Sequence, residues 1–292
     1  MKLSCTPFSL GGTIRSGEMD LEGWVRFAAE QGLDGVDLLD SHGYPWLWKE
    51  TAGRPGRVVE WARREGVAIA GYGCSNNFAV ADPERHRCEV ENARFALREA
   101  AEAGAPFLRI FGGTFEGVGN GGGYGGFALA YEQIRRGLDL LLVDAERCGV
   151  VLALENHGRL PGHAWELRSL VESHASPWLR VLFDYGNFLG NSMDEPQDPL
   201  RAWPVLAAYV VGAHYKDFRT AAPGSGRKFE PCRLGAGVVP VRQLTAEMVR
   251  SGYDGFFSLE CGALPGGSEK EGVVRCLEDM REMKRLFERL KP

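Results

Sequence analysis

Short apolar runs alternate with amphipathic segments along the whole chain. The apolar runs have the length and composition of buried strands, whose side chains are covered on both faces. The segments between them follow helical periodicity, and several stop at a glycine, which commonly ends a helix. The predicted strands are Lys2–Ser4 with Phe8–Leu10, Gly35–Asp40, Val67–Cys74, Phe107–Phe111, Val150–Glu155, Leu179–Asp184, Val210–His214 and Gly255–Glu260. The predicted helices are Met19–Gln31, Arg57–Glu65, Asp82–Gly104, Tyr131–Cys148, Ala164–His174, Pro199–Tyr209, Val241–Ser251 and Ser268–Leu290.

This alternation predicts a parallel sheet covered by helices. Eight strand–helix units in 292 residues fit a closed (β/α)₈ TIM barrel better than an open doubly wound sheet, which is the alternative. No change of composition and no linker divides the chain, so residues 1–292 are expected to form a single domain.

Side-chain alternation within the strands supports the barrel. Residues two positions apart point to the same face of a strand. The small residues Ala153, Gly212 and Ser258 stand two positions before the polar residues that end their strands, Glu155, His214 and Glu260. Each small residue therefore shares a face with the polar end of its own strand. Mostly bulkier apolar residues occupy the opposite face. The small residues are expected to point into the barrel and the bulky ones toward the helices.

The composition of the chain argues against several classes of protein. The net charge of −5 provides no basic footprint for nucleic acid or for an anionic membrane surface. No apolar run approaches the roughly 18 residues of a membrane span, and the first residues lack the apolar core of a signal peptide. The seven cysteines form no Cys-x-x-Cys pair and are expected to be reduced thiols. These features predict a cytoplasmic protein.

Four predicted strands in succession end in a side chain that can bind a metal: Glu155, Asp184, His214 and Glu260. In a barrel of this type the carboxyl ends of the strands converge on one face, where active sites lie. Three carboxylates and an imidazole gathered there would need a compensating cation. The oxygen-rich set suits Mn²⁺ or Mg²⁺, with Zn²⁺, Co²⁺ or Fe²⁺ as alternatives.

Several segments resemble motifs of the xylose isomerase-like TIM-barrel superfamily, which includes ketose 3-epimerases, hydroxypyruvate isomerases and inosose dehydratases. They are Leu154-Glu155-Asn156-His157, Phe183-Asp184-Tyr185-Gly186-Asn187, His214-Tyr215-Lys216-Asp217, and Leu234–Pro240 with Gly252–Gly255 and Leu259-Glu260. Their order and spacing follow the family pattern over nearly the whole chain. The resemblance implies that Glu155, Asp184, His214 and Glu260 bind one divalent ion, with Mn²⁺ expected first. It also implies that Glu155 and Glu260 form the acid/base pair.

The chemistry expected at such a site is isomerisation or epimerisation of a small sugar, keto-sugar or cyclitol. A carboxylate removes the proton next to a metal-polarised carbonyl, and the metal stabilises the enediolate that forms. Loss of a β-hydroxyl would instead make the enzyme an inosose or 3-keto-sugar dehydratase, a lyase, which is the main alternative. Two further alternatives are an endonuclease IV-like hydrolase, which would need a histidine-rich trinuclear zinc site, and a non-catalytic barrel subunit.

Four polar residues near the strand ends are candidate substrate contacts: His157, Asn187, Lys216 and Arg219. A structural loop histidine is an alternative for His157, and pairing with Asp217 is an alternative for Lys216. Asn187 falls where epimerases of the family often carry histidine, which argues against a simple ketose epimerase. Arg219 lies close to, but not at, the spacing of a substrate-binding arginine in those epimerases.

Three other features lead to expectations about the barrel and its assembly. Arg109 interrupts an apolar strand, so it either points into the barrel or pairs with an acid, and a structural role is expected. The glycine-rich segment Phe111–Gly126 is expected to be a mobile lid. The segment Asp217–Val239 is expected to be a basic loop that covers the site, meets a partner subunit or contacts an anionic substrate, and a solvated basic loop is the equal alternative. The resemblance implies a homodimer or homotetramer.

Overall fold

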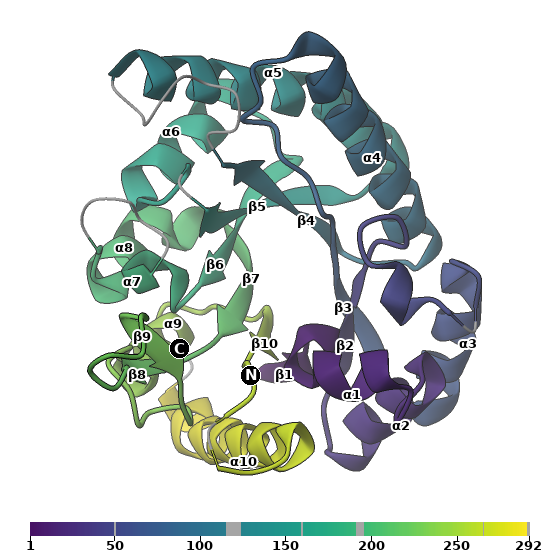
Figure 1. Ribbon diagram of the computed structural model, residues 1–292, viewed down its shortest axis with the longest axis vertical. Helices are drawn as coiled ribbons and strands as arrows, with labels where there is room; N and C mark the ends of the chain where they lie inside the picture. Colours follow the sequence, from purple (N-terminus) through teal and green to yellow (C-terminus); the bar gives the residue numbers. More distant parts are fainter. Residues whose placement is uncertain (50, 115–123, 159, 191–195, 265, 291–292) are drawn as a thin grey trace.

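Eight parallel strands form a nearly closed barrel surrounded by helices in the computed structural model of the chain (Figure 1). The structure describes residues 1–49, 51–114, 124–158, 160–190, 196–264 and 266–290. The barrel strands are β1 (Lys2–Cys5), β2 (Gly35–Leu39), β3 (Ala68–Gly73), β4 (Phe107–Gly113), β5 (Val151–Gly158), β6 (Leu179–Asp184), β7 (Val210–Tyr215) and β10 (Phe256–Leu259). They lie in the order β1-β10-β7-β6-β5-β4-β3-β2. From β2 to β10, each barrel strand is therefore hydrogen-bonded to the next barrel strand in the chain, and β10 is hydrogen-bonded to β1. The predicted (β/α)₈ barrel is confirmed.

Asp34 joins the first and second strands, where the barrel closes. Its backbone N–H donates to the Leu3 carbonyl at 2.8 Å, and its Oδ2 accepts the Leu3 N–H at 2.8 Å. Lys284 of the last helix donates to the same carboxylate oxygen at 3.0 Å. The residue before β2 therefore ties together the two ends of the chain and the closing strands.

The helices lie outside the strands and alternate with them (Figure 1). They are α1 (Gly11–Ser16), α2 (Leu21–Glu30), α3 (Pro55–Glu65), α4 (Pro83–Glu102), α5 (Tyr124–Cys148), α6 (Ala164–His174), α7 (Asn187–Gly190), α8 (Pro199–Leu206), α9 (Val241–Arg250) and α10 (Glu269–Phe287). The side chains of Asp20, Asp82 and Ser268 accept N–H groups in the first turns of α2, α4 and α10, as N-cap residues do. Each predicted helix is present, although α5 begins earlier than predicted.

Two local predictions are wrong. Phe8–Leu10 does not extend the first strand but belongs to a 3₁₀ turn, Pro7–Leu10, because Pro7 has a fixed φ and no N–H to give a strand ladder. The segment Asp217–Val239, predicted as a loop, contains an antiparallel hairpin of β8 (Phe218–Thr220) and β9 (Phe229–Pro231). The predicted lid, Phe111–Gly126, lies largely outside the described residues.

An ion pair and a buried carboxylate hold the β8–β9 hairpin. Arg219 lies opposite Glu230 in the two strands, and its Nε donates to Glu230 Oε1 at 2.7 Å. Such cross-strand pairs stabilise short hairpins. Just before β8, the carboxylate of Asp217 accepts the N–H groups of Gly235, Gly237 and Val239 at 2.9–3.1 Å. Asp217 thus fixes the return of the hairpin to the barrel.

One aromatic ring fills the interior of the barrel below the strand ends. Phe107 packs there against Ala153 and Leu182. A Cβ on Gly71 would lie 2.6 Å from the Phe107 ring, and a Cβ on Gly212 would lie 2.7 Å from it. Both glycines therefore leave space that the ring occupies. The predicted inward positions of Ala153 and Gly212 are confirmed, and this packed layer supports the polar strand ends.

Candidate metal centre

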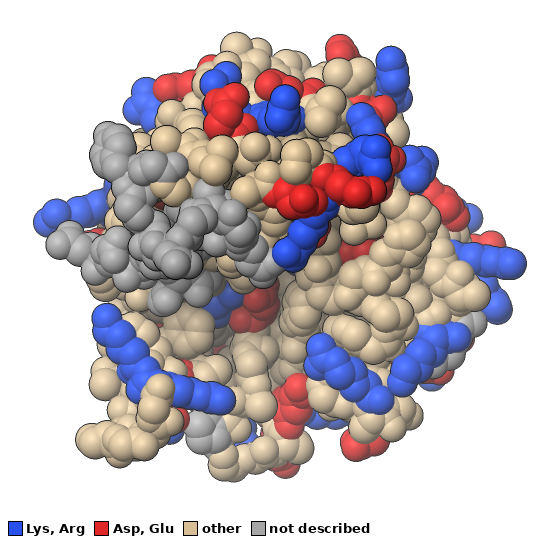
Figure 2. Space-filling model, turned by 45° about the horizontal axis from the view of Figure 1, so that its top comes forward, with Lys and Arg blue, Asp and Glu red and all other residues tan. Residues whose placement is uncertain are grey.

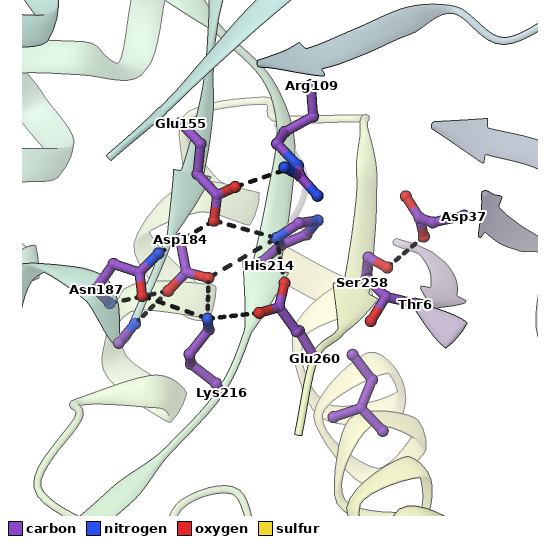
Figure 3. A network of polar contacts seen from close by, with 12 residues as sticks. Thr6, Asp37, Arg109, Glu155, Asp184, Asn187, His214, Lys216, Ser258 and Glu260 are labelled. Atoms are coloured by element: carbon purple, nitrogen blue, oxygen red, sulfur yellow. Dashed lines mark hydrogen bonds and ion pairs between the residues drawn. The ribbon is translucent and has the colours of Figure 1, made fainter. Parts of the chain in front are cut away.

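Four side chains converge at the carboxyl-terminal end of the barrel (Figure 3). Glu155 lies on β5, Asp184 ends β6, His214 lies on β7, and Glu260 directly follows β10. One potential ligand atom from each lies within 4.8 Å of the other three. The strand register explains this meeting, because Asp184 and Ser258 both pair with His214 from opposite sides. The structure thus brings together the four residues that the sequence selected.

Two basic groups lie among the three carboxylates. His214 Nδ1 is 2.8 Å from Glu260 Oε2, 3.5 Å from Glu155 Oε1 and 3.8 Å from Asp184 Oδ2. Lys216 Nζ is 2.8 Å from both Asp184 Oδ2 and Glu260 Oε1. All of these residues are buried except Glu260, whose side chain is 22% exposed. Glu260 therefore faces the open side of the cluster.

Burial and charge act in opposite directions on the pKa values of this cluster. Burial alone raises the pKa of Glu155, but the bond to His214 and its charge overcome this and hold the pKa at about 2. Burial prevails at Asp184, where the pKa is raised to about 6 despite the nearby Lys216. Burial alone lowers the pKa of His214, but Glu260 and Glu155 raise it to about 10. The site therefore stabilises separated charges in a buried environment.

Backbone contacts fix the orientation of Asp184. Its Oδ1 accepts the N–H groups of Gly186 and Asn187, each at 2.9 Å. Asn156 also clamps the Asp184 backbone, because its Nδ2 donates to the Asp184 carbonyl at 2.9 Å and its Oδ1 accepts the Asp184 N–H at 2.8 Å. Asp184 Oδ2 is left facing the cluster.

The donor set fits a hard divalent cation. Asp184 Oδ2 and His214 Nδ1 are buried and lack a well-formed hydrogen bond among the described residues, although charged atoms lie nearby. Buried atoms of this kind need a further partner. Carboxylate oxygens and an imidazole nitrogen are suitable ligands for Mn²⁺, Mg²⁺ or Zn²⁺. The four residues could hold one ion, and Mn²⁺ stays a prediction.

The four predicted substrate contacts occupy different places. His157 lies at the pocket, with its ring centroid 4.2 Å from that of Phe111. Asn187 lies inside the cluster, where its Nδ2 donates to Glu155 Oε1 at 3.1 Å and its Oδ1 accepts from Lys216 Nζ at 3.3 Å. Arg219 lies apart on the hairpin, paired with Glu230. Contact of any of these residues with a substrate stays a prediction.

A pocket of about 510 Å³ opens beside the cluster. Binding sites for small molecules typically have volumes of about 300–1,000 Å³. Its polar part includes Arg109, Glu155, His157, Lys216, Asp217 and Glu260, and its aromatic and apolar part includes Phe8, Tyr44, Phe111, Phe218 and Pro231. Figure 2 shows a hollow on one face of the molecule with charged side chains inside it, among surface charges of both signs.

Arg109 and Tyr44 are pocket residues that the sequence did not assign to the site. Arg109 Nε lies 3.3 Å from Glu155 Oε2, so this arginine both points into the barrel and pairs with an acid. Its isolation within an apolar strand is the signal that could have identified it. Tyr44 lies in the connection after β2, and no pattern in the sequence places it at the site.

The fold and the four strand-end side chains define a TIM barrel with a candidate divalent-metal centre. The chain belongs to the xylose isomerase-like TIM-barrel family, whose sequence model matches residues 25–283. No curated protein matches it in sequence. Among the described residues, no helix is both long and apolar enough to cross a membrane.

Solved structures share the fold along nearly their whole length. A D-tagatose 3-epimerase-like protein is 17% identical and superimposes with a TM-score of 0.77, covering 99% of each chain. The probable 3-DHS dehydratase AsbF from Bacillus anthracis is 18% identical, with a TM-score of 0.70 and coverage of 96% of this chain and 99% of that chain. The 3-keto-D-glucoside 4-epimerase YcjR from E. coli is 14% identical, with a TM-score of 0.69 and coverage of 91% and 94%. Proteins with this fold therefore include an epimerase, an epimerase-like protein and a probable dehydratase.

Proposed function

We propose that the chain is a divalent-metal-dependent sugar isomerase or epimerase. The observation that carries this proposal is the convergence of Glu155, Asp184, His214 and Glu260, whose ligand atoms lie within 4.8 Å of one another beside a small-molecule pocket. Membership of the family and the epimerases among the structural neighbours support it. The substrate would be a small sugar, keto-sugar or cyclitol.

Glu155 and Glu260 are the proposed acid/base pair. When bound, a divalent ion would polarise a carbonyl oxygen and lower the energy of the negative charge that develops there. One of the two carboxylates removes the proton from the carbon next to that carbonyl. The other returns a proton to the opposite face of the same carbon to give an epimer, or to the neighbouring carbon to give an isomer. Lys216 donates to Glu260 Oε1 at 2.8 Å, which favours the ionised form of Glu260 and so suits this carboxylate to the role of the base.

A dehydratase is the second candidate, and two pocket residues favour it. Elimination needs an acid that protonates the departing hydroxyl group, in addition to the base that removes the proton. His157 and Lys216 both line the pocket and provide groups beyond the carboxylate pair. Lys216, held as a cation between Asp184 and Glu260, is the candidate acid. Burial instead lowers the pKa of His157 and favours its neutral form, which suits it to act as an additional base.

Solvent deuterium exchange tests the proposal. The protein loaded with Mn²⁺, Co²⁺ or Zn²⁺ would be incubated in D₂O with ketoses, keto-inositols and 3-keto-sugars, and the products examined by NMR and mass spectrometry. Deuterium at the carbon next to a carbonyl, abolished in Glu155→Gln and Glu260→Gln, supports an isomerase or epimerase. Loss of water from the substrate identifies the dehydratase. Exchange that both variants retain would contradict the acid/base assignment.

A further inference from the structure

Arg109 is a buried cation at the edge of the pocket. It lies on β4, points inward, and is 3% exposed. Burying a guanidinium is costly unless its N–H groups are matched by acceptors. Its Nη1 donates to the Cys74 carbonyl at 2.8 Å. Its Nε lies 3.3 Å from Glu155 Oε2 but makes no well-formed hydrogen bond among the described residues. The Nε–H group of the Arg109 guanidinium therefore lacks a well-placed acceptor.

The surroundings of Arg109 are shaped to hold the guanidinium in place. Its Cζ lies 4.1 Å from the centre of the Phe111 ring, a cation–π contact. A Cβ on Gly73 would lie 2.6 Å from Arg109 Nη2, so this glycine provides room for the head group. A stacked and forked guanidinium is the usual protein group for binding planar carboxylates.

Neither nearby carboxylate is committed to Arg109. Asp40 is close enough to affect its electrostatics, but both Asp40 oxygens already accept backbone N–H groups, from Gly43 at 2.6 Å and Ser75 at 2.8 Å. Glu155 is a candidate metal ligand, and its other oxygen accepts from Asn187. Two further partners of the guanidinium are neutral: the Cys74 carbonyl and the hydroxyl of Tyr44.

The balance of charges at the site also favours binding of an anion. Arg109 and Lys216 lie on opposite sides of Glu155, Asp184 and Glu260 (Figure 3). These two cations offset two of the three carboxylates. A divalent ion held by the cluster, with the histidine ligand neutral, would bring the ion and these five side chains to an excess of one positive charge. Asp40, a further acidic group close to Arg109, has its pKa raised by burial, which disfavours its ionised form. A buried excess charge is unfavourable unless a counter-charge accompanies it.

We propose that Arg109 is a specificity-determining residue that binds a carboxylate of the substrate. The natural substrate is then a polyhydroxylated carbonyl compound bearing one carboxylate, rather than a neutral sugar. This inference rests on the proposed function, because it places the carboxylate beside the metal centre. The aromatic side chains of the pocket contact the carbon skeleton, and Arg109 fixes which end of the molecule faces β4.

Matched ligand pairs test this inference by isothermal titration calorimetry on the metal-loaded protein. The probes are 2-keto-D-gluconate with D-fructose, and D-galacturonate with D-galactose, because each pair differs only in a carboxylate and a hydroxymethyl group. We expect at least one carboxylate to bind about 10- to 100-fold more tightly than its partner. Arg109→Gln should remove this preference and Arg109→Lys should retain part of it. Arg242→Gln, which alters an exposed arginine on α9, is the matched control.

Metal content, measured on the same samples, separates this inference from the proposed function. The inference about Arg109 alone is overturned if the protein holds one metal ion per chain but prefers the carboxylate in neither pair. The same conclusion follows if the metal-loaded protein binds none of the probes. A preference that Arg109→Gln retains also overturns it, because the metal would then be its source. Equal weakening of both members of a pair, with loss of metal, would make Arg109 only a positioning residue for Glu155. Absence of metal in the wild type overturns both proposals.

Discussion

Asn156 shows how a residue that touches no ligand can determine the geometry of the candidate centre. It is fully buried and makes two hydrogen bonds to the backbone of Asp184, so it sets the distance between the ends of β5 and β6. Residues that support metal ligands in this way commonly affect affinity about 10- to 100-fold. The resemblance included Asn156 in a motif, but its clamp on the next strand became visible only in three dimensions.

Asn156→Ala should therefore weaken both the fold and the centre. Two buried backbone groups lose their partners, which should reduce the free energy of unfolding by about 2–4 kcal/mol. Urea denaturation measures this loss, and titration with Mn²⁺ measures the accompanying loss of affinity. Asn92→Ala on the exposed face of α4 is the control and should change stability by less than about 0.5 kcal/mol. Equal effects of the two substitutions would argue against the clamp.

The buried carboxyl group of Asp37 should make the stability of the protein depend on pH. This β2 carboxyl is buried inside the barrel, where Ser258 Oγ donates to it. Burial raises its pKa, and His214 and Ser258 offset this only in part. Because the folded state holds the proton more tightly, the contribution of Asp37 to stability is largest below the unfolded pKa of about 3.9. That contribution falls as the pH rises through the folded pKa.

Asp37→Asn should remove this dependence on pH. The stability of the variant relative to the wild type should rise from pH 4 to pH 7, by about 1.4 kcal/mol for each unit by which the folded pKa exceeds the unfolded one. Urea denaturation of both proteins across this range gives the difference directly. A difference that stays constant, or that falls as the pH rises, would show that Asp37 is ionised at little cost in the folded protein.

The sequence predicted the residues of this site unevenly. Glu155 and Glu260 could be found because a carboxylate at the end of an apolar run is unusual and demands a partner. Arg109 carried the same kind of signal, but its direction could not be derived without the position of Glu155. Tyr44 carried no signal, because side chains in a connecting segment follow no periodicity.

At the scale of elements, the barrel strands were predictable because each is an apolar run between helices with clear stops. The β8–β9 hairpin was not, since its strands are only three residues each and their burial is partial. Its pairing depends on contacts such as Arg219 with Glu230, which are eleven positions apart in the chain. Likewise, the 3₁₀ turn at Pro7 follows from backbone geometry, which the apolar pattern does not reveal.

Because the Phe107 ring packs against Gly71 and Gly212, a larger residue at either position should destabilise the barrel. Gly212→Ala places a Cβ 2.7 Å from the ring, so β7 or β4 must shift. Overpacking of this kind should reduce the free energy of unfolding by about 1–3 kcal/mol. Adding Phe107→Leu should recover part of this loss, because the smaller side chain leaves room for the new methyl group. Urea denaturation of the two single variants and the double variant provides the test.

Gly56→Ala is the matched control for this substitution. A Cβ there would lie 3.4 Å from Glu102 Oε1, an ordinary contact, and the position is in the first turn of α3. Alanine favours the helix by up to about 1 kcal/mol, so stability should be unchanged or slightly higher. Additive effects of Gly212→Ala and Phe107→Leu would show that Phe107 does not fill the space left by Gly212.

At the scale of the whole molecule, the strand order assembles the centre from residues more than a hundred positions apart. Glu155 lies on β5 and Glu260 directly follows β10, and the sheet order β10-β7-β6-β5 brings both beside His214 of β7. The contacts of Asp34 with Leu3 and Lys284 hold the barrel together on its other side, between β1 and β2. The homodimer or homotetramer that the resemblance implies stays a prediction.

The number of metal ions bound per chain is the sharpest test of the candidate metal centre. The purified protein would be loaded with Mn²⁺, Co²⁺ or Zn²⁺, dialysed, and analysed by inductively coupled plasma mass spectrometry beside Glu155→Gln, Asp184→Asn and Glu260→Gln. Glu278→Gln, on the exposed face of α10, is the control. We expect about one ion per chain in the wild type and the control, and weakened or abolished binding in the three site variants. No bound ion with any of the three metals, or equal binding in all variants, would contradict the candidate metal centre.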